Sequence, residues 1–183
     1  MSEAGITGHA MPLSRFAVPA HDRWFEDYIP GTVYEFDGFQ VEQQAVVRFA
    51  REFDPQPFHI DEQAATESVF GGLIASGWHT ASMMMRVLVD EYISSVASLS
   101  SPGIDELRWL APVRPGDTLR VRATVLEARQ SRSKPDRGIV RSRFEVLPPD
   151  SLPVMSMQAI NLFACKPSKD LARSRPQQPG DKA

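Results

Sequence analysis

A carboxylate and an imidazole lie five residues apart in the segment DPQPFH (residues 54–59), with Asp54 and His59 at its two ends. The two prolines between them restrict the backbone, which favours a fixed geometry. An Asp and a His that converge on one point can hold a water molecule, one accepting its proton while the other orients it or protonates a substrate. Either residue can act as the general base once a cleft perturbs its pKa. The alternative is an Asp that caps a turn and a His that packs locally, because two-residue motifs are common by chance.

A glycine with a second possible role follows in the segment IASG (residues 74–77), where an apolar helix is expected to begin. Gly77 in the first turn of a helix exposes a backbone N–H without an intrahelical partner, and the helix dipole adds partial positive charge. Together they could stabilise a developing oxyanion, such as the enolate oxygen of a thioester, in a site closed to water. The alternative is that Gly77 only allows close packing.

Helices and strands must position these two segments, and the hydrophobic pattern predicts where they lie. Residues 32–39 are rich in β-branched and aromatic side chains, which indicates a strand. Residues 41–53 then have the i, i+3, i+4, i+7 spacing of an amphipathic helix, with apolar side chains at Val46, Phe49, Ala50 and Phe53. This helix is expected to end before Pro55. A compact loop and a short helix at about residues 61–66 follow.

The second half of the chain predicts one long helix and then a sheet. From Gly77 to about Val96 apolar side chains lie on nearly every side, so we expect a buried helix, and the serine-rich stretch 94–103 is typical of a polar loop. Strand-like runs follow at residues 106–112, 118–129, 139–147 and 153–165. In the second run, four apolar residues alternate with polar ones, which indicates one buried sheet face: Leu119, Val121, Ala123 and Val125. The pattern predicts an α+β architecture, a curved sheet wrapped on the helix.

The composition fits one domain and excludes several classes of function. The chain has 183 residues and a mass of 20.4 kDa, with 42% apolar and 23% charged residues, enough for one sizeable core. We expect a flexible segment at residues 1–21, a domain at 22–166 and a disordered tail at 167–183. A net charge of -3 provides no global positive field for nucleic acid or an anionic membrane. Neither a signal-peptide core nor an apolar run long enough to span a bilayer is visible, which predicts a cytoplasmic protein.

Cys165 is the only cysteine, so an intrachain disulfide and a multi-cysteine metal site are excluded. A protein without disulfides is compatible with a reducing cytosol. Catalysis is therefore assigned to oxygen and nitrogen groups, and no metal is predicted.

Two blocks of the sequence resemble the MaoC-like dehydratase family, whose members include the (R)-specific enoyl-CoA hydratases. Residues 49–80 resemble the family's hydratase signature, which is Asp, any residue, Asn, Pro, any residue, His, any residue, Asp, and then an Ala-His-Gly that opens the central helix. Residues 107–119 (LRWLAPVRPGDTL) resemble the family's arginine-containing strand, Pro-Val turn and Pro-Gly-Asp-Thr loop. The two blocks cover most of the predicted domain, in the family's order.

This resemblance implies a hot dog fold, in which an antiparallel sheet wraps a long central helix. It also implies that Asp54 and His59 are the catalytic dyad and that the backbone N–H of Gly77 binds the thioester oxygen. The dyad would position a water for syn addition to a trans-2-enoyl thioester, or catalyse the reverse dehydration. The thioester of coenzyme A or of an acyl carrier is then the substrate, and no cofactor is predicted. The family's acyl sites lie at a subunit interface, so at least a homodimer is implied.

Two positions depart from the family pattern and join Gly77 as candidate oxyanion or substrate-binding residues. Gln56 stands where the family commonly has Asn, and Ser76 stands where it commonly has His. His79 lies about one turn into the helix and could partly replace the missing imidazole. A buried, hydrogen-bonded core histidine is the alternative for His79.

Two further groups of residues have open interpretations. Many basic residues lie between Arg108 and Arg143 and could receive the phosphates of coenzyme A or a phosphopantetheine carrier, or could form the solvated face of the sheet. Residues 83–85 are three methionines that, with Trp78, could line an acyl tunnel or could pack in the core.

Two other functions remain as alternatives. A hot dog thioesterase would share the fold, but its catalytic carboxylate usually lies on or facing the central helix, where Asp90 and Glu91 come late. A non-catalytic acyl-CoA-binding protein would keep the pocket and tolerate loss of the dyad. The presence of Asp54, His59 and Gly77 argues against both.

Overall fold

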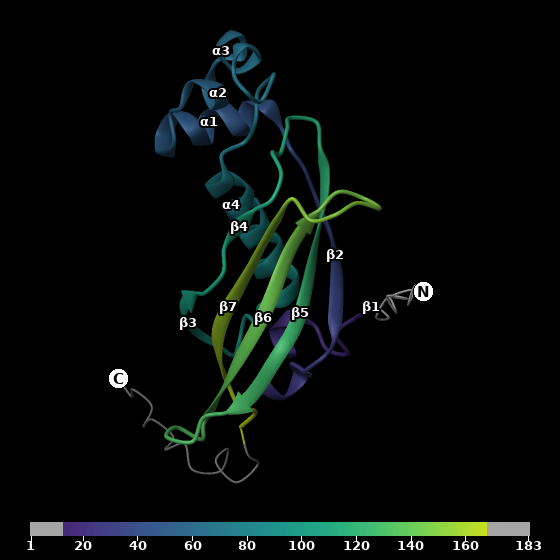
Figure 1. The fold of residues 1–183 in the computed structure, drawn as a ribbon. Helices are drawn as coiled ribbons and strands as arrows, with labels where there is room; N and C mark the ends of the chain where they lie inside the picture. The colour runs from purple at the N-terminus through teal and green to yellow at the C-terminus, as the bar shows by residue number, and fades with distance from the viewer. Residues whose placement is uncertain (1–12, 168–183) are drawn as a thin grey trace, which may run out of the picture.

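The computed structural model describes residues 13–167, which form one curved sheet and a group of helices (Figure 1). The seven strands lie in the order β1-β2-β5-β6-β7-β3, and β4 pairs with β7. Their bounds are β1 Leu13–Ser14, β2 Val33–Gln40, β3 Ser98–Ile104, β4 Arg108–Trp109, β5 Thr118–Gln130, β6 Arg137–Leu147 and β7 Met155–Ala164. The pairing is antiparallel throughout except between β1 and β2.

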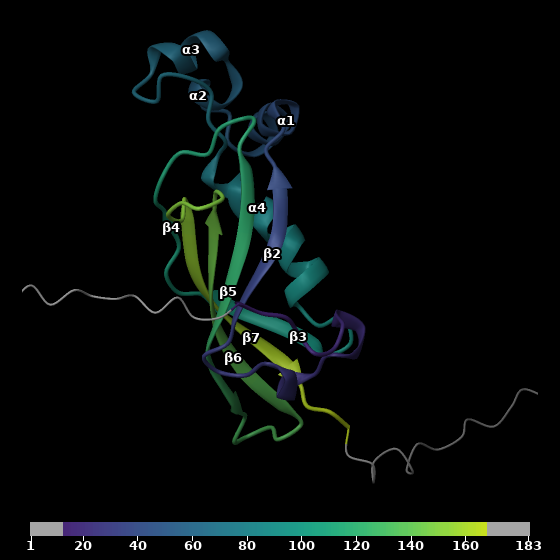
Figure 2. The same cartoon turned by 90° about the vertical axis from the view of Figure 1, so that its right-hand side faces the viewer.

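One helix lies along the sheet and three lie together at its end. Figure 2 shows α4 running along one face of the sheet, while α1, α2 and α3 form a separate group above it. The helix bounds are α1 Gln43–Phe53, α2 Pro57–Ile60, α3 Glu62–Glu67 and α4 Gly77–Val87. Short turns complete the chain at η1 Ala20–Asp22, η2 Phe25–Asp27 and the π-type turn η3 Leu88–Tyr92. The predicted α+β architecture is confirmed.

The alternation in β5 is present as predicted. Leu119, Val121, Ala123 and Val125 are fully buried against the helix side of the sheet. Between them, Arg120 and Arg122 point to the other face, where both contact the carboxylate of Glu35 on β2, at 2.6 and 3.0 Å. One face of the sheet thus forms the core and the other is charged.

The long helix differs from the prediction in two ways. Its α-helical part ends at Val87 and continues only as the π turn to Tyr92, because Ile93 adopts an extended backbone conformation (φ -79°, ψ 129°). Ser94 then accepts backbone N–H groups from the residues that follow, which holds the chain in a turn instead of a helix. The helix is also not buried on every side, since the sheet covers one face only and Met85 and Val89 on the other are 44% and 45% exposed.

The predicted polar loop at residues 94–103 is wrong over most of its length, because β3 occupies Ser98–Ile104. All seven residues of β3 are exposed, and the strand lies at the edge of the sheet. Backbone pairing with β7 defines it, so it lacks the apolar alternation from which strands are predicted. The expected strand at 106–112 shortens to β4, and the expected loop after Asp54 contains the helical turn α2, which begins with Pro57 at a position that favours proline.

Residues ahead of the predicted domain boundary at residue 22 contact the core. Leu13–Ser14 pair with β2, and the ring of Phe16 stacks on Tyr34 with centroids 3.9 Å apart. Arg23 is 3% exposed and donates to the carbonyls of Glu91 and Tyr92 at the end of η3, both at 2.8 Å. The folded unit therefore begins before residue 22. Predictions for residues 1–12 and 168–183 lie outside the described residues.

Within residues 13–167, no helix combines the length and apolar character needed to cross a bilayer.

Candidate active site

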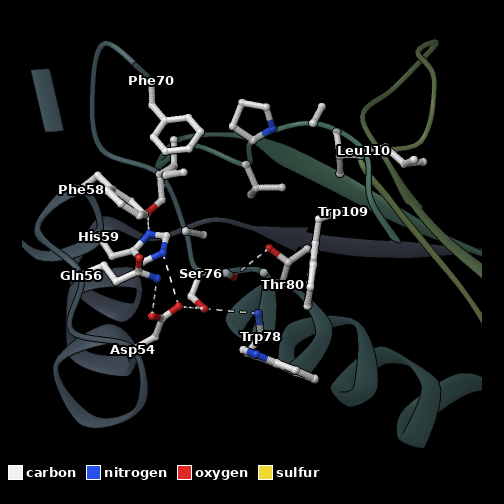
Figure 3. A pocket seen from close by; sticks show the side chains of 17 residues that line it. Asp54, Gln56, Phe58, His59, Phe70, Ser76, Trp78, Thr80, Trp109 and Leu110 are labelled. Atoms are coloured by element: carbon white, nitrogen blue, oxygen red, sulfur yellow. Dashed lines mark hydrogen bonds and ion pairs between the residues drawn. The ribbon is translucent and has the colours of Figure 1, made fainter. Parts of the chain in front are cut away.

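Asp54 and His59 face each other at the junction of α1 and α2 (Figure 3). Asp54 ends α1, where its N–H donates to Ala50 at 2.8 Å, and its carbonyl accepts the N–H of Gln56 at 2.8 Å. This turn brings the chain into α2, which includes His59. The Asp54 Oδ2 and His59 Nε2 atoms lie 3.4 Å apart. The structure therefore brings together the carboxylate and the imidazole that the sequence spacing suggested.

The backbone at Ile74 fixes the orientation of the His59 ring. His59 is 4% exposed, and its Nδ1 lies 2.8 Å from the carbonyl oxygen of Ile74. Because a carbonyl only accepts, Nδ1 must donate, and Nε2 of the neutral ring presents a lone pair towards Asp54. Two acceptors side by side can share one water that donates a hydrogen to each. The arrangement is suited to holding a reactive water molecule.

Hydrogen bonds reach both oxygens of the Asp54 carboxylate. The Ser76 hydroxyl donates to Oδ2 at 2.7 Å, and the Gln56 amide donates to Oδ1 at 2.7 Å. The Ser76 bond is the largest of the effects that lower the pKa of Asp54, with Gln56 and His59 adding to it and burial opposing it. Asp54 is therefore stabilised as a carboxylate. Ser76 and Gln56 are the two positions that depart from the family pattern, and both donate a hydrogen bond to Asp54.

Gly77 begins α4, and its backbone N–H has no acceptor among the described residues. A Cβ atom at this position would lie 2.3 Å from Nε1 of Trp109, well inside van der Waals contact. Glycine thus allows the close packing that was the alternative interpretation, and it also leaves a donor at the positive end of an 11-residue helix.

A cavity of about 470 Å³ joins the dyad to the start of α4. Asp54, His59, Ser76 and Gly77 line one part of it (Figure 3). The remaining wall is mostly apolar and aromatic, and it includes Phe58, Phe70, Trp78, Trp109, Leu110 and Val113. Polar groups at one end and an apolar wall elsewhere suit a ligand with a reactive polar head and a hydrocarbon chain.

His79 does not line this cavity. Its ring is 7% exposed and stacks on Phe49 of α1 with centroids 4.8 Å apart. Burial lowers the pKa of His79, and the nearby charge of Arg48 adds to the effect. The structure thus places His79 in the core between α1 and α4. This matches the alternative interpretation in its burial but not in its hydrogen bond, because Nδ1 of His79 has no partner among the described residues.

Several residues of the cavity were not among the candidates from the sequence, and Thr80 and Trp109 lie beside Gly77. Thr80 is 1% exposed and lines the cavity one turn after Gly77, on the face of α4 that the i, i+3 spacing assigns to the same side. Trp109 reaches the cavity from β4, and its contact with Gly77 joins segments that are distant in the sequence. Spacing could have indicated Thr80, whereas nothing local indicates Trp109.

Several arginines between Arg108 and Arg143 are bound to carboxylates, whereas a phosphate-binding role of the other basic residues in this range stays a prediction. Arg120 and Arg122 bind Glu35, Arg141 binds Asp105 at 2.8 Å, and Arg137 binds Asp136 at 2.7 Å. These groups belong to the polar face and edges of the sheet and are already paired. None of the methionines at residues 83–85 lines the cavity, and Met84 is buried in the core.

Known proteins resemble this chain over most of its described length. The MaoC like domain model matches residues 26–145. The crystal structure of the MaoC-like dehydratase from Rhodospirillum rubrum is 41% identical, covers 80% of this chain and 99% of its own, and superposes with a TM-score of 0.74. The uncharacterized protein YdeM of Bacillus subtilis is 28% identical over 109 residues, which are 60% of this chain and 77% of that protein.

A more distant neighbour shows the fold. The R-hydratase PhaJ1 from Pseudomonas aeruginosa is 20% identical, covers 87% of this chain and 96% of its own, and has a TM-score of 0.61. The sheet wrapped on α4 is the hot dog fold of these structures. The family model, the close structural neighbour and the arrangement of the fold agree, and the chain belongs to the MaoC-like domain family.

Proposed function

We propose that this protein adds water reversibly to a trans-2-enoyl thioester and gives a 3-hydroxyacyl thioester. The observation that supports this most directly is the Asp54–His59 pair, 3.4 Å apart in a cavity that also contains the unpartnered N–H of Gly77. Membership of the MaoC-like family and the likeness to a MaoC-like dehydratase support the same class of reaction.

The reaction needs a polarised thioester and an activated water. The carbonyl oxygen would accept the N–H of Gly77, whose position at the start of α4 favours negative charge on that oxygen. The water held by Asp54 and His59 would attack C3, its oxygen forming the new C–O bond. The water gives up one proton to the dyad, the C2=C3 π bond breaks, and C2 gains one proton from the dyad. The pair returns to its starting state, with no change of oxidation level and no cofactor in the scheme.

The apolar wall would hold the acyl chain. Phe58, Phe70 and Val113 supply side chains that exclude water from around the reacting double bond. The thioester carrier, either coenzyme A or an acyl carrier protein, would extend from the cavity mouth. Both carriers present the same thioester to Gly77, so both belong in the assay.

Thioester hydrolysis and simple binding are the competing functions. The late helix carboxylates that could act in a thioesterase do not line the cavity, and Asp90 is exposed and paired with Arg86 one turn away. A binding protein would keep the apolar wall, but it would not need two hydrogen bonds on the carboxylate of Asp54. Hydration is therefore the function that the geometry favours.

The decisive assay offers the protein a panel of trans-2-enoyl thioesters of varied length and branching. Hydration is measured as the loss of the absorbance of the conjugated enoyl group. We expect Asp54→Asn and His59→Ala to lower kcat by about 10²–10⁴-fold, the usual contribution of acid–base catalysis. Asp90→Asn and His21→Ala are the matched controls, since both residues are exposed and outside the cavity. Unchanged turnover in both dyad variants, or release of free thiol in place of hydration, would refute the proposal.

A homodimer is part of the same proposal. All seven residues of the edge strand β3 are exposed, and exposed apolar side chains lie at Met85 of α4 and Val89 of η3. Strand edges and apolar faces of this kind are normally covered in a stable protein. Light scattering coupled to size exclusion should give twice the chain mass, and a monomer at micromolar concentration would contradict this.

A further inference from the structure

Ser76 is the only side chain described here that directly connects Asp54 to the start of α4. It is 0% exposed, donates its hydroxyl hydrogen to Asp54 Oδ2 at 2.7 Å, and accepts the backbone N–H of Trp78 at 3.3 Å. A hydroxyl has a single hydrogen, and the amide of Trp78 can only donate. The hydroxyl hydrogen must therefore point to Asp54, and the bond has a defined direction.

The segment from Ile74 to Gly77 contacts both members of the dyad and supplies the candidate oxyanion donor. The carbonyl of Ile74 accepts Nδ1–H of His59, and the hydroxyl of Ser76 binds Asp54. Gly77 lines the cavity, and its N–H has no acceptor among the described residues. Four consecutive residues thus set the distance between the dyad and the oxyanion donor. The Ser76 contact is the one that depends on a side chain.

The Ser76 bond also determines which directions of the carboxylate remain available. A carboxylate has about four lone-pair sites, and Ser76 and Gln56 each occupy one, on different oxygens. The two bonds fix the plane of the carboxylate and leave its other lone pairs for water and for His59. Within the described residues, His59 is the titratable group that faces Asp54, so the electrostatic environment of Asp54 consists of these three neighbours.

We propose that Ser76 is a positioning residue for catalysis, which holds Asp54 as a carboxylate directed at the reactive water. This inference rests on the proposed hydratase function and deepens it. The MaoC-like family commonly has a histidine at this position, and this chain has a buried hydroxyl. That hydroxyl donates a hydrogen bond to Asp54 and also caps α4. Ser76 does not contact the substrate in this scheme, and it acts through Asp54.

The test compares Ser76→Ala with the same substitution at a second buried serine that lies outside the cavity. Ser94→Ala is that control, because Ser94 is 1% exposed, accepts the backbone N–H groups of Val96 and Ala97, and lies outside the cavity. We expect Ser76→Ala to lower kcat/KM by about 10- to 100-fold, the value of one hydrogen bond to a charged group, mainly through kcat. Ser94→Ala should lower stability and leave the rate per folded molecule unchanged.

The pH profile separates positioning from folding. Without the Ser76 hydroxyl the pKa of Asp54 should rise, so the acid limb of kcat/KM moves to higher pH in Ser76→Ala and stays in place in Ser94→Ala. Ser76→Thr keeps the hydroxyl, so the acid limb of its kcat/KM profile should lie at the same pH as in the wild type. An acid limb that does not move in Ser76→Ala would overturn the proposal.

A titration of the Asp54 carboxyl carbon by NMR, assigned with Asp54→Asn, tests the same bond without any substrate. An upward shift of its midpoint in Ser76→Ala supports the positioning role, and an unchanged midpoint overturns it. If the wild-type protein hydrates none of the thioesters, the hydratase proposal fails on that result. The NMR titration then still decides whether Ser76 holds Asp54 as a carboxylate.

Discussion

Adding one methyl group at Gly77 should damage the site through Trp109. An ideal Cβ at Gly77 would lie 2.3 Å from Nε1, 2.4 Å from Cε2 and 2.6 Å from Cδ1 of the Trp109 indole. Carbon contacts are favourable from about 3.5 Å, so the ring must move by about 1 Å. Overpacking of this size costs about 1–3 kcal/mol, and alanine in the first turn of α4 recovers at most about 1 kcal/mol of that. We expect Gly77→Ala to lower the free energy of unfolding by about 1–2 kcal/mol.

The effect on the reaction should exceed the effect on stability. A displacement of about 1 Å in a group that positions substrate can cost about 10²-fold in rate, and Trp109 lines the cavity beside the N–H that would bind the thioester oxygen. Urea denaturation and kcat/KM should therefore be measured for Gly77→Ala, Trp109→Ala and the double variant. Because the clash needs both side chains, the double variant should be more stable than the sum of the single effects predicts. Strict additivity, or a Gly77→Ala protein with wild-type stability and rate, would refute this reasoning.

Two further predictions concern stability. The hydrogen bonds to Asp54 lower its pKa, so they contribute stability that is fully present above the ordinary pKa of 3.8 and is lost as the pH falls through the lowered pKa. In Asp54→Asn the urea midpoint should therefore depend less on acid pH than in the wild type. Parallel curves of midpoint against pH would argue against the contact with Ser76. Arg23→Ala removes three hydrogen bonds from a buried guanidinium to the carbonyls of Val18, Glu91 and Tyr92. At about 1.5 kcal/mol each, the free energy of unfolding measured in urea should fall by about 4 kcal/mol, whereas Arg86→Ala on the exposed face should change the urea midpoint little.

The predictable elements of the fold are those with one buried and one exposed face, because their apolar and polar residues then alternate in the sequence. In β5 the alternation follows from the requirement that Val121 and Ala123 face the core while Arg120 faces water, so residue type indicates the strand directly. The edge strand β3 has no buried side chain and was predicted as a loop, because its backbone pairs with β7 whatever its side chains are. The end of α4 was missed for a similar reason. The Ser94 and Arg23 contacts that hold the chain there come from side chains whose partners are backbone atoms.

For the site, spacing indicated which residues could meet but not what each would contact. Asp54 and His59 are close because two restricted turns separate them, and this follows from the prolines. His79 and Ser76 were both possible replacements for the family histidine. The period of α4 turns His79 towards Phe49 of α1, and the helix N-cap geometry turns the Ser76 hydroxyl towards Asp54. These directions depend on how α1 packs against α4, which no local pattern contains.

The replacement of a histidine by Ser76 also constrains how the site can work. An imidazole at that position could exchange protons with the dyad, whereas the single hydrogen of the Ser76 hydroxyl is donated to Asp54 and its oxygen accepts a backbone N–H. In the proposed reaction, proton transfer would therefore run between Asp54, His59 and the attacking water. His59 is restricted in the same way, since its Nδ1 is bound to the Ile74 carbonyl and only Nε2 faces Asp54. In the proposed hydration, Asp54 and Nε2 of His59 would then be the two positions at which the dyad takes up and returns a proton.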